Sequence, residues 1–206
     1  MKFSTWPRLL VVDVEGNGAN PPDLVEIAAI PVENGEPQPD ALREWLIRPP
    51  APIPPRITRI HGITNDMVTG APAWVEVAGE VGSVLDSAWI CAHSAGVEYG
   101  VLTRHLPGWQ PAGVIDTLRL AKAALPGHKG FGLDPLIQHA GIELDSVAGT
   151  RHRAGYDAHA TALLLQWLAA RYDTWDELIT HAVPPQMPGL PAAVTPEDEH
   201  EEQTLW

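Results

Sequence analysis

Short apolar runs separated by turn-forming residues dominate the first fifty positions of the chain. The runs cover residues 9–14, 24–32 and 45–48, and clusters of Gly, Asn, Pro and Asp lie between them. Continuous apolar runs of this length are typical of buried strands, and the short separations favour neighbouring antiparallel strands. We therefore predict three antiparallel strands at the start of the chain.

The pattern becomes helical after a Pro-rich segment at residues 49–55. Trp74, Ala78, Val81 and Leu85 recur at intervals of three and four residues, which places them on one face of a helix. Beyond this helix, the pattern predicts strands at 88–92 and 114–115, and helices at 97–106, 117–125, 133–140 and 154–172. Three antiparallel strands followed by alternating strands and helices predict an α/β fold, a mixed sheet with helices on both faces.

The end of the chain has a different composition from the rest. From residue 183 onward it is rich in Pro and then acidic, without Lys or Arg. We expect a single domain at residues 1–182 and a tail at 183–206 that lies outside the fold. Solvated, disordered chain is the simpler interpretation of this tail, and a docking peptide for a partner is the alternative.

Charge and cysteine content narrow the function classes. The chain has 26 acidic residues against 13 Lys and Arg, a net charge of −13, so general attraction to polyanions does not drive its binding. Any nucleic acid must be held locally. The single cysteine, Cys91, excludes an intramolecular disulfide and a multi-thiolate metal site. The apolar run at residues 9–12 is too short for a secretory signal or a membrane span, so we expect a cytoplasmic protein.

Two acids end the first predicted strand. Asp13 and Glu15 follow Leu, Leu, Val and Val, and residues two apart on a strand point to the same face. Adjacent anions on a buried scaffold are costly unless a cation lies between them. The pair therefore suggests a metal site, whereas the simpler alternative is a strand end with solvated acids.

A calcium-binding loop is a rival interpretation of this segment. Asp13, Glu15, Asn17 and Gly18 approximately match the first half of such a loop. The twelfth position, which requires a bidentate Glu, is Leu24, and two prolines interrupt the loop. A strand rather than a helix also precedes it, so the calcium loop is disfavoured.

Two further segments carry acids at element boundaries. In CAHSAGVEYGVL, residues 91–102, a strand ends and a helix begins, which brings Glu98 near the carboxyl end of the sheet, where ligands collect. In HRAGYDAHATALLL, residues 152–165, Asp157 lies in the opening turns of a helix and His152 lies just before it. Solvation of Glu98 and a favourable helix-dipole position for Asp157 are the structural alternatives.

Four acids and one histidine suit two-metal phosphoryl hydrolysis. Paired cations need several carboxylates to offset their charge and to fix their spacing. A histidine titrates near neutrality and can accept the proton of the attacking water.

Five ordered motifs resemble the DnaQ-like, DEDDh-type 3′–5′ exonucleases: VVDVEGNG, IHGIT at 60–64, CAHSAGVEYGVL, VIDTLRLA at 114–121 and HRAGYDAHATALLL. The resemblance covers about residues 8–172. It implies a ribonuclease H-like fold and hydrolysis that depends on two Mg²⁺ ions, with Mn²⁺ as a substitute. The implied reaction releases nucleoside 5′-monophosphates from single-stranded or frayed 3′ ends of DNA.

The same resemblance implies a role for particular residues. Asp13, Glu15, Glu98 and Asp157 would hold the two metals, and His152 would be the general base. A second set would bind the substrate: Val14, Gly16 and Asn17 beside the terminal nucleotide, His61 and Ile63 lining its pocket, and Ser94 in the second motif.

The second motif departs from the family pattern. Ser94, Val97 and Glu98 stand where the family usually has Asn, Phe and Asp. Two alternatives therefore stay open: an enzyme of the same fold that degrades RNA or short oligonucleotides, and a catalytically impaired module that binds nucleic-acid ends.

Other residues have two interpretations each. Arg151 and Arg153 flank His152, where they could touch a substrate phosphate or simply be exposed arginines at a helix start. Trp74 and Trp109 are expected to pack in the core rather than to stack on bases. The remaining histidines show no metal-ligand spacing and are expected to be structural or solvated: His93, His105, His128, His139 and His159.

Overall fold

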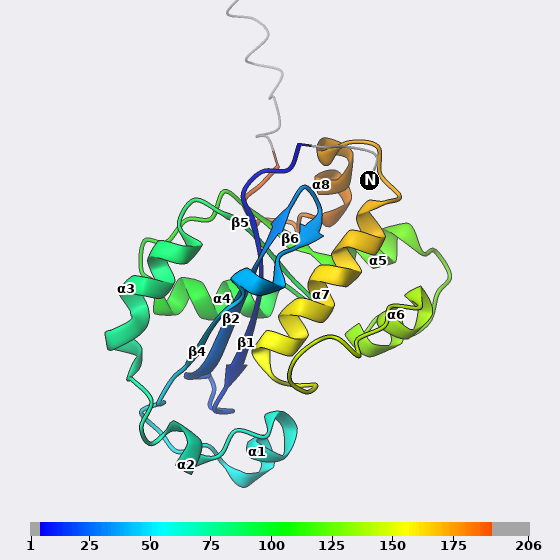
Figure 1. Ribbon diagram of the computed structural model, residues 1–206. Coiled ribbons are helices and arrows are strands. Elements are labelled where there is room, and N and C mark those ends of the chain that lie inside the picture. The colour runs from blue at the N-terminus through cyan, green and yellow to red at the C-terminus, as the bar shows by residue number, and fades with distance from the viewer. Residues whose placement is uncertain (1–4, 191–206) are drawn as a thin grey trace, which may run out of the picture.

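The computed structural model describes residues 5–190, which form one sheet covered by helices (Figure 1). The strands are β1 (Leu9–Gly16), β2 (Leu24–Glu33), β3 (Glu36–Pro37), β4 (Arg43–Leu46), β5 (Trp89–Ala92) and β6 (Gly113–Asp116). The helices are α1 (Pro55–His61), α2 (Asn65–Val68), α3 (Trp74–Leu85), α4 (Gly96–His105), α5 (Thr117–Ala124), α6 (Leu133–Ala140), α7 (Ala154–Ala169) and α8 (Trp175–Ala182), with a 3-10 turn at Pro39–Ala41.

The sheet is mixed, as the pattern predicts. Strand β1 pairs antiparallel with β2 and parallel with β5, and β5 pairs parallel with β6. Strand β2 also pairs antiparallel with β3 and β4 at the other edge. Four antiparallel strands, β1 to β4, therefore precede the alternating part of the fold where the pattern predicts three, and the predicted mixed sheet with helices on both faces is confirmed.

Alternation along β1 divides the core into two layers. Leu9 and Val11 pack with helices α5 to α8, whereas Leu10 and Val12 pack with helices α3 and α4 on the opposite face. Strand side chains alternate between faces, so each face of the sheet needs its own helical cover. The long helix α7 crosses the sheet over β1 and β2 (Figure 1). The carboxyl end of β1 points toward α1 and α2.

Four elements were not anticipated from the sequence pattern: β3, α1, α2 and α8. Helix α1 begins at Pro55 inside the predicted Pro-rich crossing, because proline is well tolerated in the first turn of a helix. The start of helix α8 is indicated in the sequence by Thr174 followed three residues later by Glu177. Thr174 is the N-cap residue, and its side chain accepts a hydrogen bond from the Glu177 N–H. Strand β4 lies two residues earlier than predicted, and residues 47–48 continue as isolated pairings.

The first part of the predicted tail packs on the fold. Val183 is buried, and the Val114 N–H donates a hydrogen bond of 2.9 Å to the carbonyl of Pro188. Met187 lies against Ala92 and Ala95. Residues 183–190 therefore belong structurally to the domain, in contrast to the expected boundary at 182. The rest of the tail, residues 191–206, lies outside the described residues.

A glycine fixes α1 beside the end of β1. Gly18 has a φ of +75°, and a Cβ there would lie 2.4 Å from Cγ1 of Ile57 on α1. We therefore expect Gly18→Ala to lower the free energy of unfolding by about 1–3 kcal/mol through strain and overpacking. Urea unfolding measures this change. Gly79→Ala is the control, because a Cβ at Gly79 meets nothing within 4 Å and the residue lies within helix α3. Equal effects of the two substitutions would refute the close packing at Gly18.

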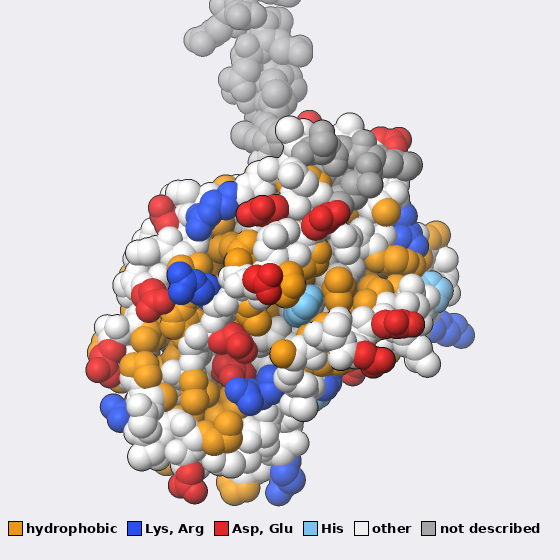
Figure 2. Space-filling model, viewed as in Figure 1, with side chains coloured by type: hydrophobic (Ala, Val, Ile, Leu, Met, Phe, Trp, Pro, Cys, Tyr) orange, Lys and Arg blue, Asp and Glu red, His pale blue; other side chains and the backbone are white. Residues whose placement is uncertain are grey.

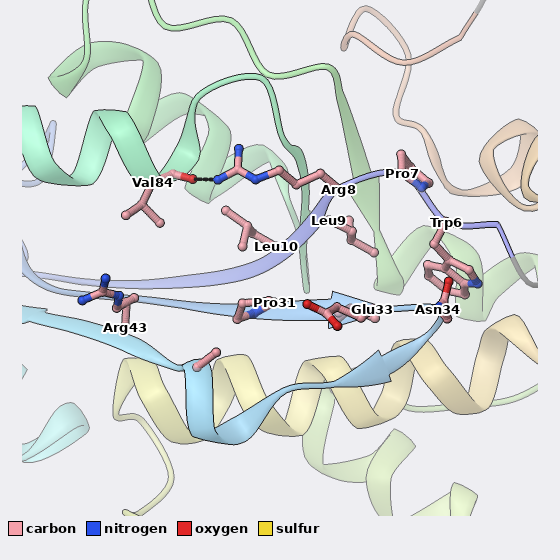
Figure 3. A pocket seen from close by; sticks show the side chains of 12 residues that line it. Trp6, Pro7, Arg8, Leu9, Leu10, Pro31, Glu33, Asn34, Arg43 and Val84 are labelled. Carbon is pink, nitrogen blue, oxygen red and sulfur yellow. Dashed lines mark hydrogen bonds between the residues drawn. The ribbon is translucent and has the colours of Figure 1, made fainter.

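A pocket of about 590 Å³ lies at the opposite end of β1 from Asp13 and Glu15 (Figure 3). Its lining includes Leu9 and Leu10 at the start of β1, Val84 near the end of α3, and Arg43. At about 3.3 Å per residue, Leu9 is roughly 13 Å from Asp13 along the strand. This pocket is therefore separate from the acidic residues.

None of the helices that the structure describes is long and apolar enough to cross a membrane.

Candidate active site

The acids of β1 lie on the face that α7 covers. Asp13 and Glu15 continue the alternation of Leu9 and Val11, so all four side chains share one face. Both acids are partly exposed, at the point where the strand reaches the edge of the core. The apolar part of the strand thus anchors two neighbouring carboxylates rigidly.

Two helices bring further acids to this edge. Glu98 lies in the first turn of α4 and is 6% exposed, and Asp157 lies in the first turn of α7 and is 4% exposed. Helix N-termini carry a partial positive charge that favours acids. Such a small exposure excludes simple solvation, which was the alternative interpretation for Glu98.

The four acids influence one another electrostatically. Burial raises the pKa of Asp13 well above its usual range, and the charges of Glu98, Asp157 and Glu15 raise it further. Burial, followed by the charge of Asp157, raises the pKa of Glu15 to about 8. Burial is also the largest cause that raises the pKa of Glu98 to about 8. The sequence-predicted acids therefore converge, and their mutual repulsion calls for a cation.

Two buried carboxylate oxygens without hydrogen-bond partners also indicate a bound cation. Oε2 of Glu98 and Oδ1 of Asp157 are buried and lack a hydrogen-bond partner. Unpaired buried acceptors are costly, and a metal ion would satisfy them. Ligand atoms of Glu15, His152 and Asp157 all lie within 4.8 Å of one another. Carboxylate oxygens are the ligands that Mg²⁺ prefers, so the donor set fits a magnesium site.

His152 lies at the rim of this cluster. It has a left-handed backbone with a φ of +63°, and its N–H donates a 3.2 Å hydrogen bond to Oδ2 of Asp157. Its side chain is exposed. The unusual backbone angle therefore places an accessible imidazole beside a buried carboxylate.

Arg151 already contacts the cluster. Its guanidinium bonds Oδ2 of Asp157, and its Nε bonds Oδ1 of Asp134 at 2.5 Å. This positive charge lowers the pKa of Asp157, although burial is the larger effect and keeps the pKa raised. Arg151 is thus a partly exposed arginine that is ion-paired at the cluster, and its contact with a substrate phosphate stays a prediction. Arg153 instead pairs with Glu26, a buried acid on β2 that sequence analysis missed.

A small apolar pocket adjoins Glu15. It measures about 190 Å³, and Val14, Gly16, Pro22, Leu24 and Val97 contribute to its lining. Two of the residues predicted to border a nucleotide, Val14 and Gly16, therefore line it. Val97, in place of the family's aromatic residue, is 60% exposed at its edge.

Asn17, which is predicted to border the terminal nucleotide, is a buried residue of the loop after β1. It is 2% exposed, and its Oδ1 accepts hydrogen bonds from the N–H groups of Ala19 and Asp23. Its Nδ2 donates to Oδ2 of Asp23 at 3.0 Å. The Asn17 side chain is thus committed to its own loop, which forms one wall of the small pocket.

Ile63 contradicts its predicted role as a pocket-lining residue. Its side chain is fully buried in a small core with Val25, Ile53 and Val68. This burial anchors the segment between α1 and α2. His61 is also buried, and its Nδ1 accepts the Ile63 N–H at 3.0 Å. Burial lowers the pKa of His61. Nearby charges have opposite effects on this pKa, since Glu26 raises it and Arg153 and His152 lower it.

Ser94 holds the turn between β5 and α4. Its φ is +71°, and its N–H donates to Oδ1 of Asp116 at 3.0 Å. The same Asp116 oxygen caps α5. The lining of the small pocket does not include Ser94. Trp74 and Trp109 pack in the core, and their ring N–H groups donate to the backbone carbonyls of His105 and Leu85.

The raised pKa values predict a pH-dependent stability in a chelating buffer. Glu98 titrates near pH 8 in the folded chain and near its usual, lower pH when unfolded. The folded state therefore binds the extra proton, and stability falls as pH rises toward 8. Glu98→Gln lacks this titrating group. We therefore expect its free energy of unfolding, relative to that of the wild type, to increase by about 1 kcal/mol or more from pH 5 to pH 9, as measured by urea unfolding. If the difference in unfolding free energy between the two proteins did not change with pH, the burial of this carboxyl would be contradicted.

Comparisons with known proteins agree with this geometry. A family model described as Exonuclease (RNase T) matches residues 10–165. The 3′-5′ exonuclease DinG of Bacillus subtilis is 33% identical over 164 residues, which cover 76% of this chain and 17% of the relative. A DNA polymerase III subunit epsilon-like protein of Rhodobacter capsulatus is 34% identical, over 74% of this chain and 22% of its own length. The chain therefore spans about a fifth of these relatives.

Solved structures show the same architecture over a larger share of their length. Exonuclease X, in complex with 5′ overhanging duplex DNA, superposes with a TM-score of 0.69 and 30% identity. The match covers 82% of this chain and 96% of that one. Escherichia coli exonuclease I in complex with a dT13 oligonucleotide superposes with a TM-score of 0.66 at 18% identity, which shows the fold alone.

Proposed function

Since the chain belongs to the 3′–5′ exonuclease family of hydrolases that act on phosphodiester bonds, we propose that it releases nucleoside 5′-monophosphates from the 3′ end of DNA. One observation carries this proposal. Four acids from β1, α4 and α7 converge with His152 at one edge of the sheet, although they lie far apart in the sequence.

We assign Asp13, Glu15, Glu98 and Asp157 to the binding of two Mg²⁺ ions, for which Mn²⁺ can substitute. When bound, such ions supply charge stabilisation at the phosphate and lower the pKa of water. Glu98 is one methylene longer than the family's Asp. Its charge nevertheless acts on Asp13, so its carboxylate reaches the cluster.

We assign the proton transfer to His152. Its imidazole is exposed at the rim, where it can accept a proton from water beside the scissile phosphate. The hydrogen bond from its backbone to Asp157 holds it against the acids. An imidazole is suited to this step because its ring nitrogen can accept a proton and pass it on.

We place the terminal nucleotide in the small pocket beside Glu15. Its apolar lining, with Val14, Leu24 and Val97, suits the face of a base or sugar. A pocket is needed because the surface offers little general attraction. Figure 2 shows acidic and basic side chains interspersed over the described part of the face in view, and the net charge of the whole chain is −13.

We propose DNA rather than RNA because similar proteins act on or bind DNA. The structure of exonuclease X holds duplex DNA, and the relative from Rhodobacter is named as a DNA polymerase subunit-like protein. Labelled DNA and RNA oligonucleotides of equal sequence test the proposal, with Mg²⁺ present. We expect mononucleotide release from DNA and slower release from RNA. Folded protein that releases no mononucleotide from either substrate would refute an exonuclease function.

A further inference from the structure

An ion pair with a buried carboxylate joins β2 to the start of α7. Nε of Arg153 lies 3.0 Å from Oε2 and 3.2 Å from Oε1 of Glu26, and Nη2 of Arg153 also bonds Oε1. Glu26 is 2% exposed, whereas Arg153 is partly exposed. The planar fork of a guanidinium matches a carboxylate, so this contact fixes orientation as well as distance.

The same carboxylate caps helix α7. The Ala154 N–H donates a 2.8 Å hydrogen bond to Oε2 of Glu26. The N-cap residue of α7 is Arg153, whose side chain provides no cap. First-turn N–H groups lack partners within a helix, and an acid at this end is stabilising. Glu26, which lies on strand β2, therefore caps the N-terminus of α7 in place of a local N-cap side chain.

This tie lies directly beside the proposed site. Glu26 is opposite Glu15 in the register of β1 and β2, and the charge of Glu26 acts on Glu15. On the helix side, Arg153 directly follows His152, and its carbonyl accepts the Asp157 N–H at 2.9 Å. One ion pair thus connects the strand that carries two of the acids with the segment that carries His152 and Asp157.

We propose that Glu26 and Arg153 are positioning residues, which together hold His152 and Asp157 in register with Glu15. The inference rests on the function proposed above. In this proposal Arg153 does not bind the substrate phosphate, because its guanidinium already donates to Glu26. Small displacements are costly in catalysis, and partners of metal ligands typically change activity or metal affinity by about 10–100-fold.

Arg153→Gln in the full chain tests this role. We expect kcat for mononucleotide release to fall about 10–100-fold, and Mn²⁺ affinity to fall as well, with KM and its salt dependence nearly unchanged. A phosphate contact would instead raise KM and reduce the salt dependence. Arg171→Gln is the matched control, since Arg171 is an exposed arginine just beyond the opposite end of α7.

A second variant tests whether the two residues act as a unit. Glu26→Gln keeps the shape and removes the charge, and the double variant Glu26→Gln/Arg153→Gln should then be about as impaired as either single variant. Arg153→Lys keeps the charge without the fork and should fall between the wild type and Arg153→Gln. It also serves as the test where Arg153→Gln does not fold.

Three results would overturn the inference: normal kcat and Mn²⁺ affinity in folded Arg153 variants, an effect on KM with a smaller salt dependence, or additive losses in the double variant. Failure of the proposed function would look different. In that case, the wild type itself would release no mononucleotide, while Mn²⁺ binding would still report on the position of Asp157.

Discussion

Asp13→Asn is expected to reduce mononucleotide release by at least about 10³-fold. A cation held at the proposed site would stabilise charge on the phosphate by several kcal/mol, and each 1.36 kcal/mol corresponds to about tenfold in rate. Asp13 is central to the cluster because the charges of Glu98, Asp157 and Glu15 all act on it. An amide keeps its shape but removes the charge that offsets the metal. Initial rates on a labelled DNA oligonucleotide in Mg²⁺ measure the loss.

The same substitution is expected to stabilise the metal-free protein. It removes one of several clustered carboxyls that repel each other, so we expect the free energy of unfolding to rise by about 1 kcal/mol, or roughly 2–4 °C in Tm, in a chelating buffer at pH 8 to 9. Asp40→Asn is the control, since Asp40 is exposed on the 3-10 turn. A variant that retains activity would remove Asp13 from the site, and a loss of stability would contradict the repulsion.

His152→Gln is expected to lower kcat by about 10²–10⁴-fold, which is the usual contribution of a general base. We expect Mn²⁺ affinity to change little, because the acids supply most of the ligands. If His152 is instead a metal ligand, as its closeness to Glu15 and Asp157 would allow, the affinity falls together with the rate. Rates and Mn²⁺ titrations on the same preparation separate these roles.

The control for His152 is a second histidine on the same segment. His159→Gln lies within α7, and His159 is partly buried there. We expect this variant to retain wild-type kcat. Equal losses at both positions would show that the measurement reports damage to α7 rather than a proton transfer.

Alternation along β1 explains why the acidic cluster could be predicted. A strand that is apolar at residues 9–12 must be buried on both faces, so Asp13 and Glu15 necessarily share one of these faces. Glu98 and Asp157 follow from the same logic, because each begins a helix that packs against the sheet. The mixed sheet likewise follows from strand spacing. These are local patterns with consequences for the whole fold.

Contacts between distant segments explain what could not be predicted. The pairing of Glu26 with Arg153 joins residues 127 positions apart. Its one sequence signal is an acid within the apolar run of β2, which sequence analysis passed over. Ile63 was assigned to a pocket by resemblance, but a side chain in a short motif can point either into the pocket or into the core. Here the small core beneath α1 and α2 takes it.

Metal binding tests the central claim most directly, because the claim is that four acids and His152 form a site for divalent cations. Mn²⁺ titration followed by electron paramagnetic resonance, with a nucleoside 5′-monophosphate present, measures the number and affinity of bound ions. We expect two ions in the wild type, and weaker or fewer ions in Asp13→Asn and Asp157→Asn. Wild-type protein that binds no Mn²⁺, or variants that bind it as tightly as the wild type, would contradict the account.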